Sequence, residues 1–339
     1  MAEPTLGYYV HHHGAGHGAR ALAIARAVRQ PITLIGSRLP AGPWPAHASG
    51  LQLPADTCEG MRAEQFDVLH YAPLGVPGLR RRMAMLAQWF EAHWPCLLVV
   101  DVSVEVALLA RLCSVPTVYV RQHGDRQDAA HRLAYETARG LLAPYPDAMA
   151  SADDPWRHKT VHTGWLSRYS GQAAGVAQVG RVLVICGHGG TGLNATLLEA
   201  AARVCPQWQF EVAGALPPGR PAANLRWLGE LADPATAMQR AEVVIGSASD
   251  SLVSEAAALG CRYIAVAEPR PFGEQAAQAR RLGQLGVALG LEAGWSAPQR
   301  WPALLAQARA LDPLQWRRWA DEHAAARAAE ALRGWSIAQ

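Results

Sequence analysis

One stretch decides the fold: Leu6-Gly7-Tyr8-Tyr9-Val10, three histidines, and then Gly14-Ala15-Gly16-His17-Gly18-Ala19-Arg20. The first part is an apolar run typical of a buried strand, and the second is a glycine-rich turn that opens a helical pattern over 21–28. A helix N-terminus attracts anions, because its free N–H groups and its dipole point outward. The histidine adds a group that exchanges a proton near neutral pH. The turn therefore predicts phosphate binding, proton chemistry, or both.

The same turn is close to the dinucleotide-binding pattern G-x-G-x-x-G/A, with Ala19 in the last position. That pattern requires an acidic residue about twenty residues further on, which binds a ribose hydroxyl. The next apolar run, 32–35, is followed instead by Gly36-Ser37-Arg38. Arg38 suits a 2′-phosphate, so an NADP-dependent oxidoreductase stays as a weaker alternative.

The composition is that of a globular protein long enough for two domains. The chain has 339 residues, of which 50% are hydrophobic, and its net charge of +3 is too mild to indicate nucleic-acid binding by itself. The six cysteines are scattered without a C-x-x-C pair, which suits buried thiols in a reducing compartment. No signal-peptide pattern and no membrane-spanning apolar run is present, so we expect a cytoplasmic protein.

Apolar runs alternate with helical patterns, which predicts parallel α/β sheets. In the first half we expect strands at 6–10, 32–35, 97–100 and 117–120, and helices at 19–29, 78–93, 104–113 and 128–142. A break over 143–180 indicates a last strand and a linker. Strands follow near 182–186, 208–212, 242–245 and 262–266, with helices at 193–204, 234–240, 251–259, 273–285, 299–310 and about 312–333.

This alternation predicts two Rossmann-like domains that face each other across a cleft. We expect an acceptor-side domain over 1–165 and a nucleotide-sugar domain over 166–312. A C-terminal helix over 313–339 is expected to pack back on the first domain.

Three loops of the second half follow predicted strands, at 187–192, 246–251 and 268–275. In open α/β sheets, ligands bind beyond the carboxyl ends of the strands. The small residues of the first two loops let backbone amides approach a diphosphate. Glu255 lies one turn into the following helix and suits ribose hydroxyls, and Gln275 offers a donor and an acceptor to a sugar.

The run Leu252-Val253-Ser254-Glu255-Ala256-Ala257-Ala258-Leu259-Gly260, followed by Pro271-x-x-Glu274-Gln275, resembles the donor-binding half of GT-B glycosyltransferases. The likeness is strongest to the MurG-like group, family 28, which uses nucleotide diphosphate sugars. The turn Gly14-x-Gly16-His17-x-x-Arg20 is similar to the N-terminal loop of that group and of PseG-type nucleotide-sugar hydrolases. The stretch 38–95 resembles nothing that we can place.

The resemblance implies a role for each matching position. His17 would be the base at the anomeric carbon, and Glu255 would bind the ribose. At the diphosphate the resemblance places Arg168, Ser249, Asp250 and Ser251. Gly189 and Gly190 would lie near a phosphate or the sugar, Leu231 at the nucleobase, and Glu274 and Gln275 at the sugar. The pair Ser249-Asp250 departs from the family, which commonly has glycine in this loop. An acid beside a diphosphate is unfavourable unless it points away or binds a sugar hydroxyl.

Glycosyl transfer needs pre-aimed donors for the departing diphosphate and a base that accepts the proton of the acceptor hydroxyl. Two helix N-termini and Arg168 supply such donors, and the sequence has no D-x-D tripeptide. We therefore expect neither a metal nor a cofactor besides the nucleotide sugar. We expect this donor to be a UDP-sugar. The family likeness implies inversion. A hydrolase or epimerase would use the same donor site, with water beside His17 in the hydrolase.

The acceptor side is expected in the first half, with His13, Gly16, Arg121 and His123 near the acceptor. Asp101 follows a predicted strand and would orient His17 or contact the acceptor, unless Asp101 or Ser103 only caps the next helix. The acceptor stays open between a small molecule, a lipid-linked sugar and a nucleic acid.

Two other patterns invite a ligand. The run His11-His12-His13 lacks further ligands nearby, so we expect no metal there. The helix over 78–93 carries Arg80-Arg81-Arg82, which favours an ordinary amphipathic helix with a charged outer face. Peripheral contact with an anionic membrane surface is the alternative for this helix. The sequence leaves the oligomeric state open.

Overall fold

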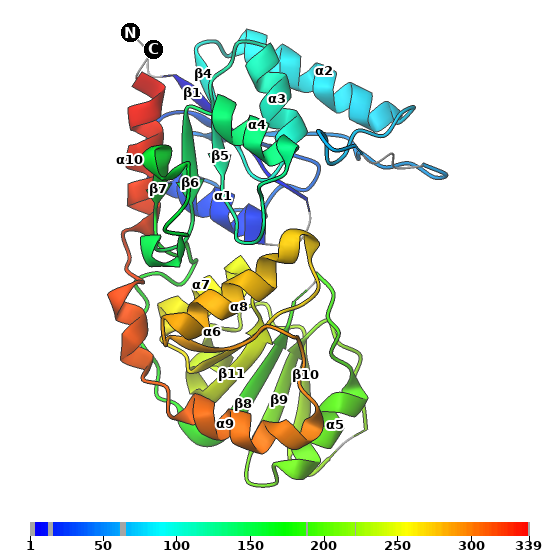
Figure 1. Cartoon of the computed structure of the whole chain (residues 1–339), viewed down its shortest axis with the longest axis vertical. Coiled ribbons are helices and arrows are strands. Elements are labelled where there is room, and N and C mark those ends of the chain that lie inside the picture. The colour runs from blue at the N-terminus through cyan, green and yellow to red at the C-terminus, as the bar shows by residue number, and fades with distance from the viewer. Residues whose placement is uncertain (1–3, 13–15, 62–65, 188, 221, 338–339) are drawn as a thin grey trace. The chain divides into compact units, whose positions relative to one another are not determined.

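The computed structural model describes residues 4–12, 16–61, 66–187, 189–220 and 222–337. It divides the chain into two compact units, and Figure 1 shows their helices and strands. Unit 1 consists of Met1–Tyr145, Ala150–Thr163 and His323–Gln339, and unit 2 of Pro146–Met149 and Gly164–Glu322. Within the described ranges, no helix is both long and apolar enough to cross a membrane.

Unit 1 is built on a parallel sheet whose described strands follow the order β3-β2-β1-β4-β5-β6-β7. Because β1 lies between β2 and β4, the strand order reverses there, and the carboxyl ends of β1 and β4 form the place where such sheets bind ligands. The strands are β1 (Thr5–Tyr9), β2 (Ile32–Gly36), β3 (Ala48–Gln52), β4 (Cys96–Val100), β5 (Thr117–Val120), β6 (Gly140–Ala143) and β7 (Thr160–His162).

Helices cover this sheet because its central strands are apolar on both faces. Gly7 in β1 leaves room for the Trp89 indole, since a Cβ there would lie 2.8 Å from that ring. The helices are α1 (Gly16–Ala27), α2 (Pro77–Ala92), α3 (Val104–Leu112), α4 (Ala129–Thr137) and α10 (Ala324–Ile337), with a short 3-10 turn η2 (Arg157–Lys159).

The chain returns to unit 1 through α10, the red helix of Figure 1, which packs against α1. The Trp335 ring lies where a Cβ of Gly140 would be, 2.1 Å from its nearest atom. Arg139 Nη1 donates to the Trp335 carbonyl at 2.7 Å, and Arg327 Nε donates to the Thr163 carbonyl at 2.9 Å. These contacts fix the last helix to the end of the unit 1 sheet.

Unit 2 repeats the design with the strand order β10-β9-β8-β11-β12-β13, so its reversal lies between β8 and β11. The strands, all parallel, are β8 (Gln178–Cys186), β9 (Gln209–Gly214), β10 (Leu225–Gly229), β11 (Ala241–Ser247), β12 (Tyr263–Val266) and β13 (Ala288–Leu291). The α-helices are α5 (Ala195–Val204), α6 (Ala235–Arg240), α7 (Asp250–Leu259), α8 (Glu274–Gln284) and α9 (Trp301–Arg309). The 3-10 turns are η1 (Asp147–Met149), η3 (Pro271–Gly273), η4 (Pro298–Arg300) and η5 (Pro313–Arg318).

The predicted pair of Rossmann-like α/β domains is confirmed, with two corrections to its elements. The helix expected over 128–142 is present but was predicted too long, because α4 ends at Thr137 and the short buried strand β6 follows. The continuous helix expected over 312–333 is wrong. The chain forms η5 in unit 2, leaves helical structure at Trp319, and begins α10 at Ala324 in unit 1.

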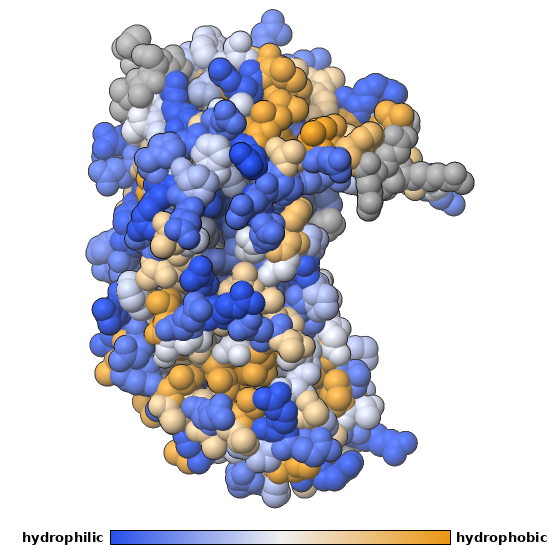
Figure 2. All heavy atoms as spheres, viewed as in Figure 1, coloured by the Kyte–Doolittle hydropathy of each residue, from blue (hydrophilic) through white to orange (hydrophobic). Residues whose placement is uncertain are grey.

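The basic helix α2 also differs from expectation. Arg80 and Arg81 are exposed, but Arg82 is buried and pairs with Asp56, so only part of the arginine run lies on an outer face. Large apolar side chains are exposed near this helix, among them Leu74 and Leu112 at 75% each. Figure 2 shows hydrophobic residues gathered over the α2 and α3 region of the displayed face.

Candidate active site

A buried carboxylate organises the ligand-binding edge of unit 1. Asp101 follows β4 directly and is fully buried. His17 and Arg20 lie one turn apart on α1 and reach the same carboxylate, through His17 Nδ1 at 3.0 Å and Arg20 Nη2 at 2.9 Å from Oδ1. Arg20 Nε at 3.1 Å and the Tyr8 hydroxyl at 3.0 Å donate to the other oxygen, Oδ2. The adjacent β1 and β4 thus bring Asp101 together with three side chains from the first twenty residues of the sequence.

His17 Nδ1 faces both a carboxylate and a guanidinium. Burial raises the pKa of Asp101, but the Arg20 guanidinium and His17 outweigh burial and hold that pKa well below its usual range. The Asp101 carboxylate, 3.0 Å from Nδ1, only accepts hydrogen bonds, and Arg20 Nη2, 3.1 Å from the same Nδ1, only donates them. A ring with its proton on Nδ1 donates to Asp101 and has its lone pair on Nε2, where it presents a base oriented by a carboxylate. A ring with its proton on Nε2 accepts from Arg20 instead.

The backbone behind Asp101 is strained. Val102 has φ of 77°, a conformation that a β-branched residue rarely adopts. Ser103 next to it caps α3, since its hydroxyl accepts from the Val106 N–H at 3.3 Å. The capping interpretation therefore applies to Ser103, whereas the Asp101 side chain faces His17 and Arg20. Strain of this kind persists where surrounding contacts fix it, and it concentrates at functional positions.

The other acceptor-side positions are placed unequally. Gly16 is the first residue of α1, and His13 lies outside the described residues. Arg121 forms an ion pair with Asp154, and its Nη1 donates to Thr160 Oγ1 at 3.2 Å. The buried His123 ring packs at 4.2 Å from the Tyr145 ring. These contacts of Arg121 and His123 lie within unit 1, and the role of both residues toward an acceptor stays a prediction.

His11 and His12, the described part of the histidine run, lie just after β1. The rings of His11 and His12 stack with centroids 4.9 Å apart, and His11 meets the His17 ring edge at 5.3 Å. His12 Nδ1 is 3.9 Å from Asp56 Oδ2. The run therefore adjoins the His17 and Asp101 pair.

A second cluster of histidine and aspartate lies at the N-terminus of α4. Asp128 accepts from His131 Nδ1 at 2.5 Å and from His70 Nε2 at 2.8 Å. Arg126 donates to His131 Nε2 at 3.1 Å, which leaves the proton of this ring on Nδ1. A metal on Nδ1 would require the opposite tautomer, against the arginine, so the arrangement favours a hydrogen-bonded clasp over a metal site.

In unit 2 the structure joins two of the predicted donor-binding residues. Arg168 Nε donates to Glu255 Oε1 at 2.9 Å, and the Arg168 guanidinium also lies 4.7 Å from the centre of the Tyr169 ring. Burial raises the pKa of the Glu255 carboxyl, and Arg168 partly offsets that effect. The Tyr169 hydroxyl in turn donates to Asp233, so the start of α6 is tied to the same group.

The serine-rich loop after β11 resolves the anomaly of Asp250. Ser249 is the N-cap residue of α7, and Asp250 and Ser251 begin the helix, so their N–H groups are among those with no intrahelical acceptor. The buried Gln278 amide on α8 lies 3.1 Å from the Ala248 carbonyl and 3.0 Å from Asp250 Oδ1. Both are acceptors, so the amide nitrogen faces them and donates to both. Asp250 is thereby bound through its carboxylate to α8.

The loop after β12 contributes a buried carboxylate that the sequence did not single out. Glu268 accepts from Gly192 N at 2.8 Å, Trp295 Nε1 at 2.7 Å and the Thr191 hydroxyl, so it connects three loops. Its own N–H donates to Gln275 Oε1 at 3.0 Å. Part of the hydrogen-bonding capacity that suited Gln275 to a sugar is therefore used within the loop.

The remaining predicted positions lie on loops of unit 2. Leu231 is half-buried just beyond β10, and Glu274 is the first residue of α8. Gly189 and Gly190 are exposed, and both their carbonyls accept from Arg270. Sequence reasoning missed Tyr8, Gln278, Glu268 and Arg270. Glu268 begins the loop predicted over 268–275, and Gln278 lies in the helix predicted to follow it. Only their buried contacts with residues far away in the sequence identify them as part of the site.

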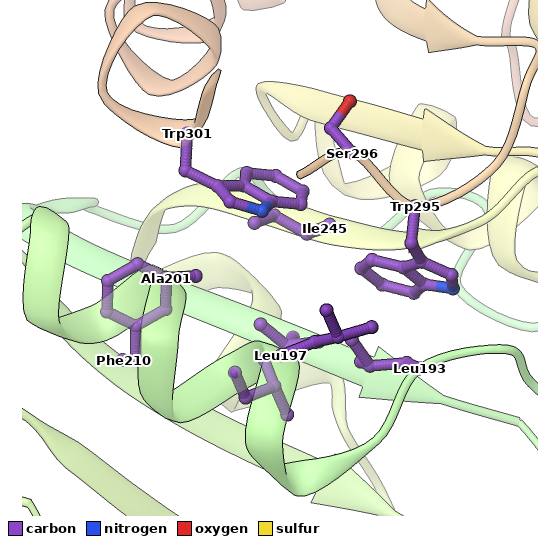
Figure 3. Close-up of a pocket in the computed structure, with 10 residues that line it drawn as sticks. Leu193, Leu197, Ala201, Phe210, Ile245, Trp295, Ser296 and Trp301 are labelled. Atoms are coloured by element: carbon purple, nitrogen blue, oxygen red, sulfur yellow. The ribbon is translucent and has the colours of Figure 1, made fainter. Parts of the chain in front are cut away.

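A small cavity of unit 2 lies beside the Trp295 loop (Figure 3). Its volume is about 10 Å³, and its lining is almost entirely apolar, including Leu193 and Leu197, Phe210 from β9, and the indoles of Trp295 and Trp301. That volume is far below what a nucleotide needs. The cavity is therefore a packing feature of the unit 2 core and not the ligand site.

Comparison with known proteins defines the class by its fold. No protein-family model matches the sequence, and no curated protein matches it significantly. Among solved structures the fold is that of GT-B glycosyltransferases, which confirms the predicted MurG-like GT-B fold.

Three of these structures cover the chain almost end to end. The MurG crystal structure of Acinetobacter baumannii has a TM-score of 0.62 at 16% identity, over 98% of this chain and 99% of that one. LpCGTa, solved in complex with UDP, has a TM-score of 0.69 at 15% identity, over 100% of both chains. The spinosyn forosaminyltransferase SpnP has a TM-score of 0.69 at 15% identity, over 98% of this chain and 100% of that one.

Proposed function

We propose that this chain is a glycosyltransferase that moves a sugar from a nucleotide diphosphate sugar to an acceptor hydroxyl, with inversion and without a metal. The observation that carries the proposal is the fully buried Asp101 carboxylate, whose Oδ1 lies 3.0 Å from His17 Nδ1 within a GT-B fold; the proposal takes the tautomer in which Nδ1 donates to Asp101. This pair orients an imidazole lone pair at the ligand-binding edge of a Rossmann-like sheet.

The proposed reaction is a single displacement. The acceptor hydroxyl gives its proton to His17 Nε2 as its oxygen bonds to the anomeric carbon. The bond from that carbon to the diphosphate oxygen breaks, and the nucleoside diphosphate leaves with the electron pair. Asp101 stabilises the imidazolium that forms, and Arg20 holds Asp101 ionised.

The donor site of this proposal lies in unit 2. Arg168 leaves Glu255 and pairs with the diphosphate, and the N–H groups at the start of α7 add further donors. Glu255 then accepts from the ribose hydroxyls, with Gln275 and Glu274 beside the sugar. Because these donors are cationic or N–H groups, the leaving group is stabilised by the protein itself, which supports metal independence.

The first test is calorimetric titration with UDP, dTDP, GDP and NADP, each with and without EDTA. Micromolar binding of one nucleoside diphosphate, unchanged by EDTA, is the expected result. Binding of NADP alone would remove the proposal and favour an oxidoreductase that uses Arg38. A requirement for a divalent ion would refute metal independence alone.

The second test separates binding from chemistry. His17→Ala should leave donor affinity unchanged and lower turnover by about a hundredfold or more, measured as release of nucleoside diphosphate. His158→Ala, an exposed histidine of unit 1, is the matched control and should retain full activity. Full activity of His17→Ala would contradict the assignment of the base. Release of free sugar at the same rate without any acceptor would identify a hydrolase instead.

A further inference from the structure

The glycine-rich loop after β8 is held by an arginine from another loop. Arg270 Nη2 donates to the carbonyls of Gly189 at 2.6 Å and Gly190 at 2.8 Å. Its Nη1 donates to the carbonyl of Pro269 at 2.7 Å, which fixes the guanidinium to its own loop. One side chain thus sets the direction of two consecutive peptide groups.

The direction of those carbonyls determines where the neighbouring N–H groups point. In a trans peptide the C=O and the following N–H are antiparallel, so the N–H groups of Gly190 and Thr191 point away from Arg270. Neither N–H has an acceptor among the residues that the structure describes. Gly190 has φ of 83°, a left-handed conformation, and consecutive N–H groups around such a residue form a concave anion site.

The same loop is fixed from its other end by Glu268. This carboxylate is only 3% exposed and accepts from Gly192 N at 2.8 Å and from the Thr191 hydroxyl. Arg270 therefore binds the carbonyls of the loop, and Glu268 binds its next N–H and hydroxyl. Two residues of opposite charge, two positions apart, leave the Gly190 and Thr191 N–H groups as the donors directed outward.

We propose that Arg270 and Glu268 are positioning residues that hold the Gly190 and Thr191 N–H groups toward the diphosphate of the donor. The inference rests on the proposed function and assigns a part of the donor site to residues outside the family likeness. The diphosphate gains two fixed backbone donors, and the nucleoside gains nothing from them. Arg270 is half-exposed, and its partners are loop carbonyls, so its removal takes little from the core.

The experiment measures how much the diphosphate adds to nucleoside binding. Affinities for UDP and for uridine are determined by calorimetry for the wild type, Arg270→Ala and Glu268→Gln. If the wild type binds dTDP or GDP instead, that diphosphate and its nucleoside are used. Arg270→Ala should weaken diphosphate binding about tenfold and leave nucleoside binding unchanged. Glu268→Gln should also weaken diphosphate binding, because the glutamine NH2 group would face one of the groups that now donate to the Glu268 carboxylate.

A matched control and a ligand-free measurement complete the test. Arg280→Ala removes the same charge from α8, where Arg280 pairs with Glu292 at 2.7 Å, and it should change neither affinity. Hydrogen exchange without ligand should quicken over 189–193 in Arg270→Ala but not in Arg280→Ala. Equal losses for diphosphate and nucleoside, or no loss at all, would overturn this inference alone. A wild type that binds none of UDP, dTDP and GDP would overturn the proposed function together with it.

Discussion

Replacing Asp101 by asparagine tests the central electrostatic claim about unit 1. Asparagine keeps the shape of the side chain but removes the charge that Arg20 faces through two hydrogen bonds, at 3.1 and 2.9 Å. Arg20 is 5% exposed and Asp101 is fully buried, so water cannot replace the lost charge. The buried guanidinium would lose the carboxylate charge that it faces through these two hydrogen bonds.

The expected loss is large for a single isosteric change. Breaking a buried ion pair by removing one partner costs about 3–5 kcal/mol, because the remaining charge stays desolvated. For a unit of this size that corresponds to a fall in melting temperature of roughly 6–20 °C. The assay is hydrogen exchange at increasing urea, in which peptides of unit 1 report the loss and peptides of unit 2 serve as the internal reference.

A double-mutant cycle separates the ion pair from simple loss of packing. In Asp101→Asn combined with Arg20→Met, no charge is left without a partner, so the double variant should be more stable than the sum of the single losses predicts. We expect an interaction free energy of about 2 kcal/mol or more. Losses that add to within about 0.5 kcal/mol, or a loss below about 1 kcal/mol for Asp101→Asn alone, would refute the reasoning.

Three further outcomes follow from other contacts. Glu255→Gln should weaken nucleoside diphosphate binding about tenfold in calorimetry, because the buried ribose acceptor loses its charge; unchanged affinity would exclude Glu255 from the site. Gly140→Ala should destabilise unit 1 by about 1–3 kcal/mol in urea unfolding, since its Cβ would meet the Trp335 ring, whereas Gly334→Ala, where a Cβ meets nothing within 4 Å, should not. Stability of unit 1 should fall as the pH drops from about 6.5 toward 4, because burial and the nearby Arg126 lower the pKa of His131 to about 4 and the unfolded chain binds the proton first. His131→Gln should flatten the dependence of unit 1 stability on pH between about 6.5 and 4. An unchanged pH dependence in this variant would contradict the attribution of the effect to His131.

The fold was largely predictable because its signals are local. Buried parallel strands such as β4 and β8 are nearly continuous apolar runs, and glycine turns follow β1 and β8. The elements that were missed lack such signals. β6 is only four residues long, and an apolar run of that length fits the end of a helix equally well. Its identity depends on Gly140 and the Trp335 ring, which are far apart in the sequence.

The candidate site was predictable only as a set of residue types. The motif placed His17 and Arg20 in one turn, but the choice between capping and orienting roles for Asp101 depended on contacts across more than eighty residues. Asp250 was an anomaly in the sequence, and only the Gln278 amide explains how a carboxylate is accommodated at the start of α7. Glu268 and Arg270 belong to no recognisable sequence motif. Their role could not be predicted because it depends on the backbone groups that they bind in the folded chain.

The two units position their functional groups by different physical means, and this difference has a consequence. In unit 1 the proposed base, His17, lies against charges that are themselves buried, so Asp101 contributes to folding and to the orientation of His17 through the same contacts. In unit 2 the cationic groups Arg168 and Arg270 remain partly exposed and act on a carboxylate or on loop carbonyls. Solvent screens these contacts, so their removal costs little folding free energy. Substitutions around Asp101 should therefore lower stability and turnover together, whereas those at Arg168 and Arg270 should lower donor affinity in a protein that stays as stable as the wild type.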